Sequence, residues 1–149
     1  MSSYVGVELR RLVIVRAKRV CEYCLIHEDD TFFGCEVDHV ISEKHGGLTE
    51  AENLAFACFN CNRRKGSDVG SITSITREFV RLFNPRTDRW ADHFFLDEVM
   101  INGKTDNGDV TARLLGFNDI DRTIERSALR DVGRYPTRDA AYIAAGLTD

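Results

Sequence analysis

The chain has 149 residues, of which 43% are hydrophobic and 30% are charged, a composition that is typical of globular proteins and excludes a disordered chain. No apolar run is as long as the roughly 18 residues that a membrane span needs. No signal peptide is recognisable, so we expect a cytoplasmic protein with reduced cysteines and no membrane partner. The formal net charge of −4 argues at face value against a nucleic-acid partner, but the acidic excess lies mostly in residues 97–149, with 10 acidic and 7 basic side chains.

The first half of the chain predicts a helix, two short strands and a second helix. Apolar residues recur at three- and four-residue spacing over residues 7–20, which indicates a helix with arginines on its other face. The remaining elements are predicted at 35–41 (strand), 54–57 (strand) and 59–65 (helix). Gly46-Gly47 marks a tight turn between the strands, and Gly66 is placed to end the second helix.

The second half predicts a hairpin and several short helices. Residues 67–92 are ambiguous, because the spacing of their apolar residues fits a helix, whereas residues 78–83 fit a strand equally well. A hairpin is expected from 93–96 and 99–102, followed by helices at 109–115, 119–132 and 137–145. The chain is therefore predicted to be a single α+β domain over 1–149, with an N-terminal helix and a C-terminal hairpin plus short helices.

Two C-x-x-C units are the strongest local signal in the sequence. They are Cys21-Glu22-Tyr23-Cys24 and Cys58-Phe59-Asn60-Cys61. Four thiolates satisfy a tetrahedral zinc ion, and such closed sites are structural. The 33 residues between the units exceed the roughly 15–20 of a common zinc ribbon, so something is inserted there. A pair of redox dithiols is the alternative, although no thioredoxin-like βαβ pattern surrounds either unit. Cys35 is expected to be a small core residue.

Polar residues of a specific order lie between and beside these cysteines. The ordered pattern C-x-x-C … D-H … G-G … N-L … C-x-x-C-N-x-x-K-G runs through residues 21–66. It resembles the HNH endonuclease family. The downstream residues Leu82-Phe83-Asn84-Pro85-Arg86 and Trp90-Ala91-Asp92-His93-Phe94 are similar to those of a group of small bacterial HNH proteins.

The resemblance implies a ββα-metal (His-Me finger) core over about 21–68, with a supporting region over about 69–149. By the resemblance, Asp38 and Asn62 would be ligands of one catalytic divalent ion, His39 the general base, and Asn53 the residue that holds the loop between the strands. Many relatives carry histidine where Asn62 stands, so this chain is an H-N-N variant. Two oxygen ligands suit Mg²⁺ or Mn²⁺, and a neutral imidazole suits proton removal from water at physiological pH. Because adjacent strand residues point to opposite faces, the strand is expected to end or bulge near Asp38.

Three basic residues follow the predicted ligand on the short helix. At least one of Arg63, Arg64 and Lys65 is expected to contact a DNA phosphate, rather than to form only a solvated face. His45 either contacts the scissile phosphate or is an exposed loop residue. His93, beside Trp90, is expected to be packed structure.

Three functions compete on these observations. The first is a metal-dependent endonuclease that hydrolyses DNA and carries a structural zinc. The second is a catalytically inactive, zinc-stabilised DNA-binding module, against which the intact set of Asp38, His39, Asn53 and Asn62 argues. The third is a redox protein that uses its C-x-x-C pairs.

Overall fold

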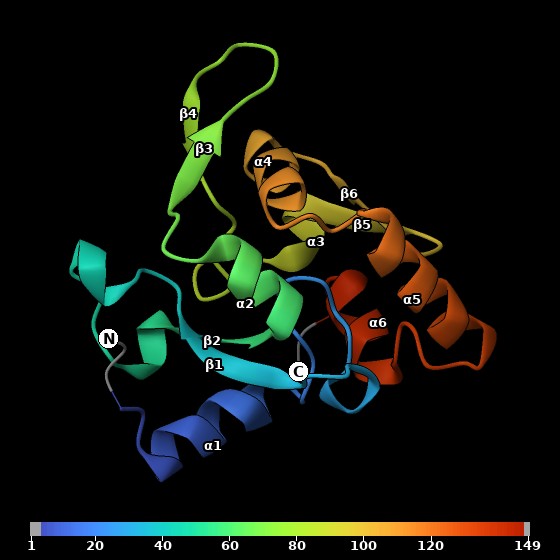
Figure 1. The fold of residues 1–149 in the computed structure, drawn as a ribbon, viewed down its shortest axis with the longest axis horizontal. Helices are drawn as coiled ribbons and strands as arrows, with labels where there is room; N and C mark the ends of the chain where they lie inside the picture. The colour runs from blue at the N-terminus through green and yellow to red at the C-terminus, as the bar shows by residue number, and fades with distance from the viewer. Residues whose placement is uncertain (1–3, 148–149) are drawn as a thin grey trace.

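Two strands and one helix from the first half of the chain form a ββα unit. In the computed structural model, which describes residues 4–147, strand β1 (Cys35–His39) pairs with β2 (Leu54–Cys58), and helix α2 (Phe59–Lys65) follows directly. Helix α1 (Val7–Arg16) lies against the opposite face of the hairpin from α2 (Figure 1). This is the predicted strand, loop, strand, helix order, and it confirms the α+β class with a ββα core.

The β1–β2 hairpin is regular along its whole length. Its antiparallel register runs from Cys35↔Cys58 to His39↔Leu54 through five consecutive pairs. The strand ends at His39, two residues earlier than predicted and one residue after Asp38, and it contains no bulge. Since side chains alternate along a strand, Asp38 and His39 leave β1 on opposite sides.

Helix α1 is shorter than the sequence pattern predicts. It ends at Arg16, and the next two residues after Ala17, Lys18 and Arg19, adopt positive φ angles of 55° and 61°. The chain turns back there so that Val20 forms a bridge with His27. The first cysteine unit is thereby placed beside the start of α2 rather than on a continuing helix.

The ambiguous segment in the middle of the chain is a hairpin, and the helical alternative is wrong. Its strands are β3 (Gly70–Ile72) and β4 (Phe79–Arg81), which pair antiparallel. This hairpin projects away from the rest of the molecule in Figure 1. Ile75, which the helical pattern places on an apolar stripe, is 92% exposed at its end.

The C-terminal region has the predicted hairpin and short helices. The hairpin is made of β5 (Phe94–Asp97) and β6 (Met100–Gly103). The helices are α3 (Trp90–His93), α4 (Asp106–Leu114), α5 (Ile120–Asp131) and α6 (Arg138–Ala144). These elements lie together beside α2 and the β1–β2 hairpin (Figure 1).

Helix α4 begins three residues earlier than predicted. Thr105 is the N-cap, and its hydroxyl accepts a hydrogen bond from the Gly108 amide. Gly108 lies inside this helix, where a Cβ would lie 2.1 Å from the carbonyl oxygen of His93, the last residue of α3. The end of α3 and helix α4 therefore approach each other closely at this glycine.

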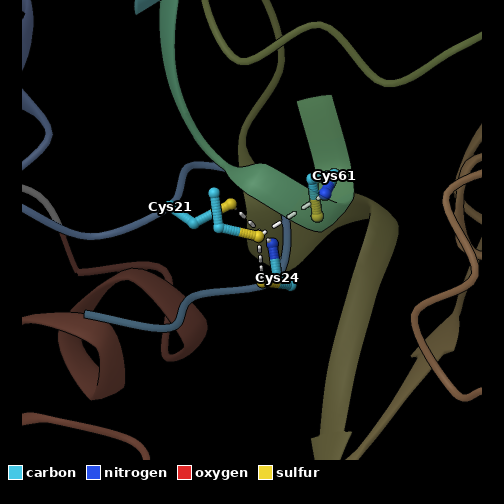
Figure 2. Close-up of side chains that lie close together, drawn as sticks. Cys21, Cys24 and Cys61 are labelled. Carbon is cyan, nitrogen blue, oxygen red and sulfur yellow. Dashed lines mark hydrogen bonds between the residues drawn. The ribbon is translucent and has the colours of Figure 1, made fainter. Parts of the chain in front are cut away.

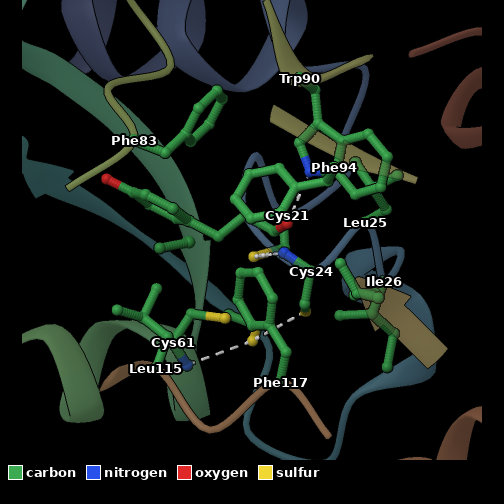
Figure 3. Close-up of a cluster of buried hydrophobic side chains, with 14 of the residues drawn as sticks. Cys21, Cys24, Leu25, Ile26, Cys61, Phe83, Trp90, Phe94, Leu115 and Phe117 are labelled. Atoms are coloured by element: carbon green, nitrogen blue, oxygen red, sulfur yellow. Dashed lines mark hydrogen bonds between the residues drawn. The ribbon is translucent and has the colours of Figure 1, made fainter. Parts of the chain in front are cut away.

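The buried side chains form two clusters. The smaller one joins α1 to the hairpin through Val13, Ala17, Leu54 and Phe56. The larger one surrounds the cysteine units with rings and aliphatic side chains from the C-terminal region (Figure 3), among them Phe83, Trp90, Phe94, Leu115 and Phe117. Within residues 4–147 no helix has the length and apolar character needed to cross a bilayer.

Candidate active site and metal centre

The four cysteines of the two C-x-x-C units converge in the larger core cluster. All four are buried, and their Sγ atoms lie within 4.8 Å of one another (Figure 2). The amide nitrogens of Cys24 and Cys61 each lie 3.5 Å from the Sγ atom three residues earlier, so both units turn in the same way. No other group of three or more His, Cys, Asp or Glu side chains within residues 4–147 is placed to hold a metal ion.

The chemistry of the cluster favours a bound cation. Burial raises the pKa of the Cys21 and Cys61 thiols, whereas hydrogen bonds from the other three cysteines lower the pKa of Cys24. The thiols therefore do not ionise together by themselves in this buried position. A divalent metal supplies the charge that lets all four act as thiolate ligands. The four residues thus fit a closed tetrathiolate site.

An arginine from the C-terminal region contacts two of these sulfurs. Arg122 on α5 is 7% exposed, and its NH2 group lies 3.1 Å from Cys61 Sγ and 3.9 Å from Cys58 Sγ. Burial by itself lowers the pKa of this guanidinium, but the neighbouring cysteines outweigh that effect and raise it. No motif in the sequence singles out Arg122. The one available signal was its i, i+4 spacing with Arg126 on the buried side of an amphipathic helix.

Other downstream residues hold the backbone of the first cysteine unit. Trp90 Nε1 donates to the Tyr23 carbonyl at 2.9 Å, and the Tyr135 hydroxyl donates to the Cys24 carbonyl at 2.7 Å. Arg86 forms an ion pair with Glu22, both of them mostly buried. The downstream motif residues Arg86 and Trp90 therefore support the cysteine cluster.

Asp38 and Lys65 form an ion pair between β1 and α2. Lys65 Nζ lies 3.0 Å from Asp38 Oδ2 and also donates to the His39 carbonyl at 2.9 Å. Burial raises the pKa of Asp38, and the Lys65 charge partly opposes that shift. Lys65 is only 3% exposed, so the expectation that it contacts DNA does not fit this structure. Its aliphatic stem is covered by the fold, and its ammonium group faces the predicted catalytic pair instead of solvent.

His39 lies at the end of β1 and is held by the loop that follows. Its Nε2 atom is 2.8 Å from Thr49 Oγ1 and 3.9 Å from a carboxylate oxygen of Glu43. No hydrogen bond to its Nδ1 atom is formed within the described residues. One ring nitrogen is thus oriented by the protein while the other remains available.

Asn53 closes that loop through three hydrogen bonds. Its Oδ1 accepts from the Ile41 amide, and its Nδ2 donates to the carbonyls of Ile41 and Leu48, each at 2.9 Å. Gly47 passes so close to this arrangement that a Cβ there would lie 1.7 Å from the Ile41 carbonyl oxygen. The geometry agrees with the loop-holding position implied for Asn53, whose part in activity stays a prediction.

Asn62 lies on α2 directly after the metal-centre residue Cys61. Its Nδ2 donates to Glu36 Oε2 at 3.1 Å, which leaves its Oδ1 without a hydrogen bond from the described residues. Lys65 binds Asp38 through Oδ2 and leaves Oδ1 unbound by that ammonium group. The two Oδ1 atoms are thus not used by these partners, and hard oxygen donors of this kind fit Mg²⁺ or Mn²⁺.

The other residues predicted to contact DNA differ in how exposed their side chains are. Arg63 is exposed and forms no ion pair within residues 4–147. Arg64 pairs with Asp119 at 2.5 Å. His45 is exposed in the loop, and its Nε2 donates to the Ser67 carbonyl at 3.0 Å, which ties the loop to the chain after α2.

The segment that carries this site is similar to a known protein family. Residues 21–68 match the family model described as HNH endonuclease. Searches of curated proteins and of solved structures gave no match. An HNH domain indicates a nuclease or DNA-binding function for the chain.

We expect the change Asn53→Ala to open the loop between β1 and β2. It removes three hydrogen bonds, each contributing about 0.5–1.5 kcal/mol. Amide hydrogen exchange over residues 41–48, followed by mass spectrometry, should become at least about tenfold faster. The control Asn60→Ala removes an exposed asparagine of α2 and should leave this segment unchanged. Equal protection of residues 41–48 in both variants would contradict the role given to Asn53.

Proposed function

We propose that the protein is a metal-dependent endonuclease that hydrolyses phosphodiester bonds of DNA. The observation that carries the proposal is the environment of His39 in an HNH domain. Its Nε2 is oriented by Thr49, its Nδ1 has no hydrogen bond from residues 4–147, and the preceding residue is the carboxylate Asp38. A histidine whose ring is oriented in this way can accept a proton from water near a phosphate.

The chain's own residues supply the proton transfer. In the tautomer that carries its proton on Nε2, His39 donates to Thr49 Oγ1, and Nδ1 can accept a proton from the attacking water. The water oxygen then bonds to phosphorus, and the bond from phosphorus to the 3′-oxygen breaks. Lys65 holds Asp38 and the His39 carbonyl at fixed positions throughout, because its three N–H donors reach both.

A divalent cation would be held by Asp38 and Asn62. When bound, such an ion supplies Lewis-acid stabilisation of the charge on the phosphate and on the leaving oxygen. We propose that the four cysteines hold one structural zinc ion.

We place the DNA on the exposed side of α2. Arg63 is the exposed cation of this helix with no partner in the described chain, and Arg64 is half-exposed beside Asp119. Ion pairs at the surface contribute only about 0–1 kcal/mol, so Asp119 does not hold Arg64 away from a phosphate. His45 remains a candidate contact from the loop.

The inactive DNA-binding module is the second candidate function. The ion pair between Lys65 and Asp38 favours it, because the ammonium group already neutralises the predicted metal ligand. Incubation of supercoiled plasmid with Mg²⁺ or Mn²⁺ separates the two functions, since only the nuclease converts it to nicked or linear DNA.

Replacing a metal-centre cysteine should unfold the protein. A structural zinc site contributes roughly 10–16 kcal/mol to folding, more than a domain of this size can lose. Cys58→Ser should therefore lose zinc and its near-ultraviolet circular dichroism. The control is Cys35→Ser, at a position outside the cluster where burial raises the pKa of the thiol, and it should keep both. A Cys58→Ser protein with a native spectrum would refute the structural zinc, and reactive thiols in a zinc-free native protein would favour the redox alternative.

Removing the base should abolish cleavage without changing the fold. His39→Ala is expected to lower the rate of plasmid nicking by about 10²–10⁴-fold. Its zinc content and DNA affinity should stay at parental values, and added imidazole should restore part of the rate. The control is His27→Ala, which removes the histidine that precedes the acidic residues 28–30. This variant should cleave normally. A His39→Ala variant that cuts at the parental rate would overturn the assignment.

The salt dependence of DNA binding locates the DNA face. Each phosphate contact contributes roughly 0.9 to the slope of log K against log salt concentration. Arg63→Gln should therefore reduce the magnitude of this slope by about one, measured by fluorescence anisotropy without divalent metal. The control Arg130→Gln removes an exposed arginine from the end of α5 and should leave the slope unchanged. If both variants reduced the slope equally, the assignment of the DNA to the exposed side of α2 would be wrong.

A further inference from the structure

Strand β1 and helix α2 meet through two parallel polar pairs. Glu36 and Asp38 are two residues apart and share the face of β1 that α2 covers. Asn62 and Lys65 are three residues apart and share one side of α2. Asn62 Nδ2 is 3.1 Å from Glu36 Oε2, and Lys65 Nζ is 3.0 Å from Asp38 Oδ2. Each strand carboxylate therefore accepts from one helix side chain.

The Asn62–Glu36 pair decides which end of the Asn62 amide can face a cation. An amide has a donor NH₂ group and an acceptor oxygen, and only the oxygen binds a metal. The carboxylate of Glu36 can accept hydrogen bonds but cannot donate them when ionised. It therefore selects the rotamer in which the NH₂ group faces Glu36 and Oδ1 is left for another ligand.

We propose that Glu36 is a positioning residue for the catalytic cation. It fixes the Asn62 amide so that Oδ1 is presented at the β1–α2 junction beside Asp38. This inference rests on the proposed function, in which Asp38 and Asn62 are the ligands. Without Glu36 the amide is free to rotate by half a turn and present its NH₂ group, which repels a cation. Partners of this kind typically change metal affinity about 10–100-fold.

Charge alone is a competing explanation, and the chain offers a way to separate the two effects. Glu36 is exposed, so its negative charge also attracts a cation through solvent. Glu36→Gln removes the charge but keeps an oxygen that can accept from Asn62. Glu36→Ala removes both. Glu50→Ala removes the charge of an exposed loop glutamate whose side chain has no contact with Asn62.

The experiment measures Mn²⁺ binding to the zinc-loaded, DNA-free protein by electron paramagnetic resonance of the free ion. We expect Glu36→Ala to weaken binding at least about tenfold, and Glu36→Gln and Glu50→Ala to weaken it less than about threefold. The side-chain NH₂ resonances of Asn62, assigned with Asn62→Leu, should lose their hydrogen-bonded shift in Glu36→Ala and keep it in Glu36→Gln. The thermal unfolding midpoint should be equal in all of these variants.

The outcomes distinguish this inference from the proposed function. If the parental protein binds Mn²⁺ and nicks plasmid, but Glu36→Ala binds as well as Glu50→Ala, the positioning role is wrong and the nuclease assignment stands. Equal weakening by Glu36→Gln and Glu36→Ala would make the effect one of charge and would also overturn the positioning role. If the parental protein neither binds Mn²⁺ nor nicks plasmid, the proposed function fails, and this inference fails with it.

Discussion

Four buried thiols within 4.8 Å of one another are the constraint on which the rest of the structure depends. They tie the turn after α1 to the first turn of α2, and the β1–β2 hairpin is the chain between these two anchors. Because Cys58 caps α2 and Cys61 lies in its first turn, the direction of the helix over the hairpin is set at the cluster. The polar side chains of α2 therefore face one side of β1, where they contact Glu36 and Asp38.

The C-terminal region completes this arrangement instead of forming a separate site. A tetrathiolate zinc centre carries a net charge of about −2, and burying it without a counter-charge is unfavourable. Arg122 places a guanidinium beside two of the sulfurs, and Trp90 and Tyr135 bond the carbonyls of the first cysteine unit.

The sequence was most informative where local chemistry decides the structure. The C-x-x-C spacing, the two turn glycines and Gly66 are short-range signals, and the positions of β1, β2 and α2 follow from them to within two residues. Lys65 shows why the rest could not be predicted. A lysine after two arginines is indistinguishable in sequence from a phosphate contact, and only the approach of α2 to a strand 26 residues earlier buries its ammonium group against the His39 carbonyl. Gly108 is similar, because the carbonyl that excludes a side chain there comes from another element.

The adjacency of Cys61 and Asn62 couples two sites that share no atoms. One peptide bond joins a sulfur of the cysteine cluster to the residue that faces β1, and a single turn of helix separates both from Lys65. Helix α2 is short, and its first turn is anchored at the thiols. A zinc ion held by these thiols, with bonds of about 2.3 Å to each sulfur, would fix the position of the first turn of α2. An ion that displaced Cys61 would therefore also displace the Asn62 amide relative to the Asp38 carboxylate, because one peptide bond joins the two residues.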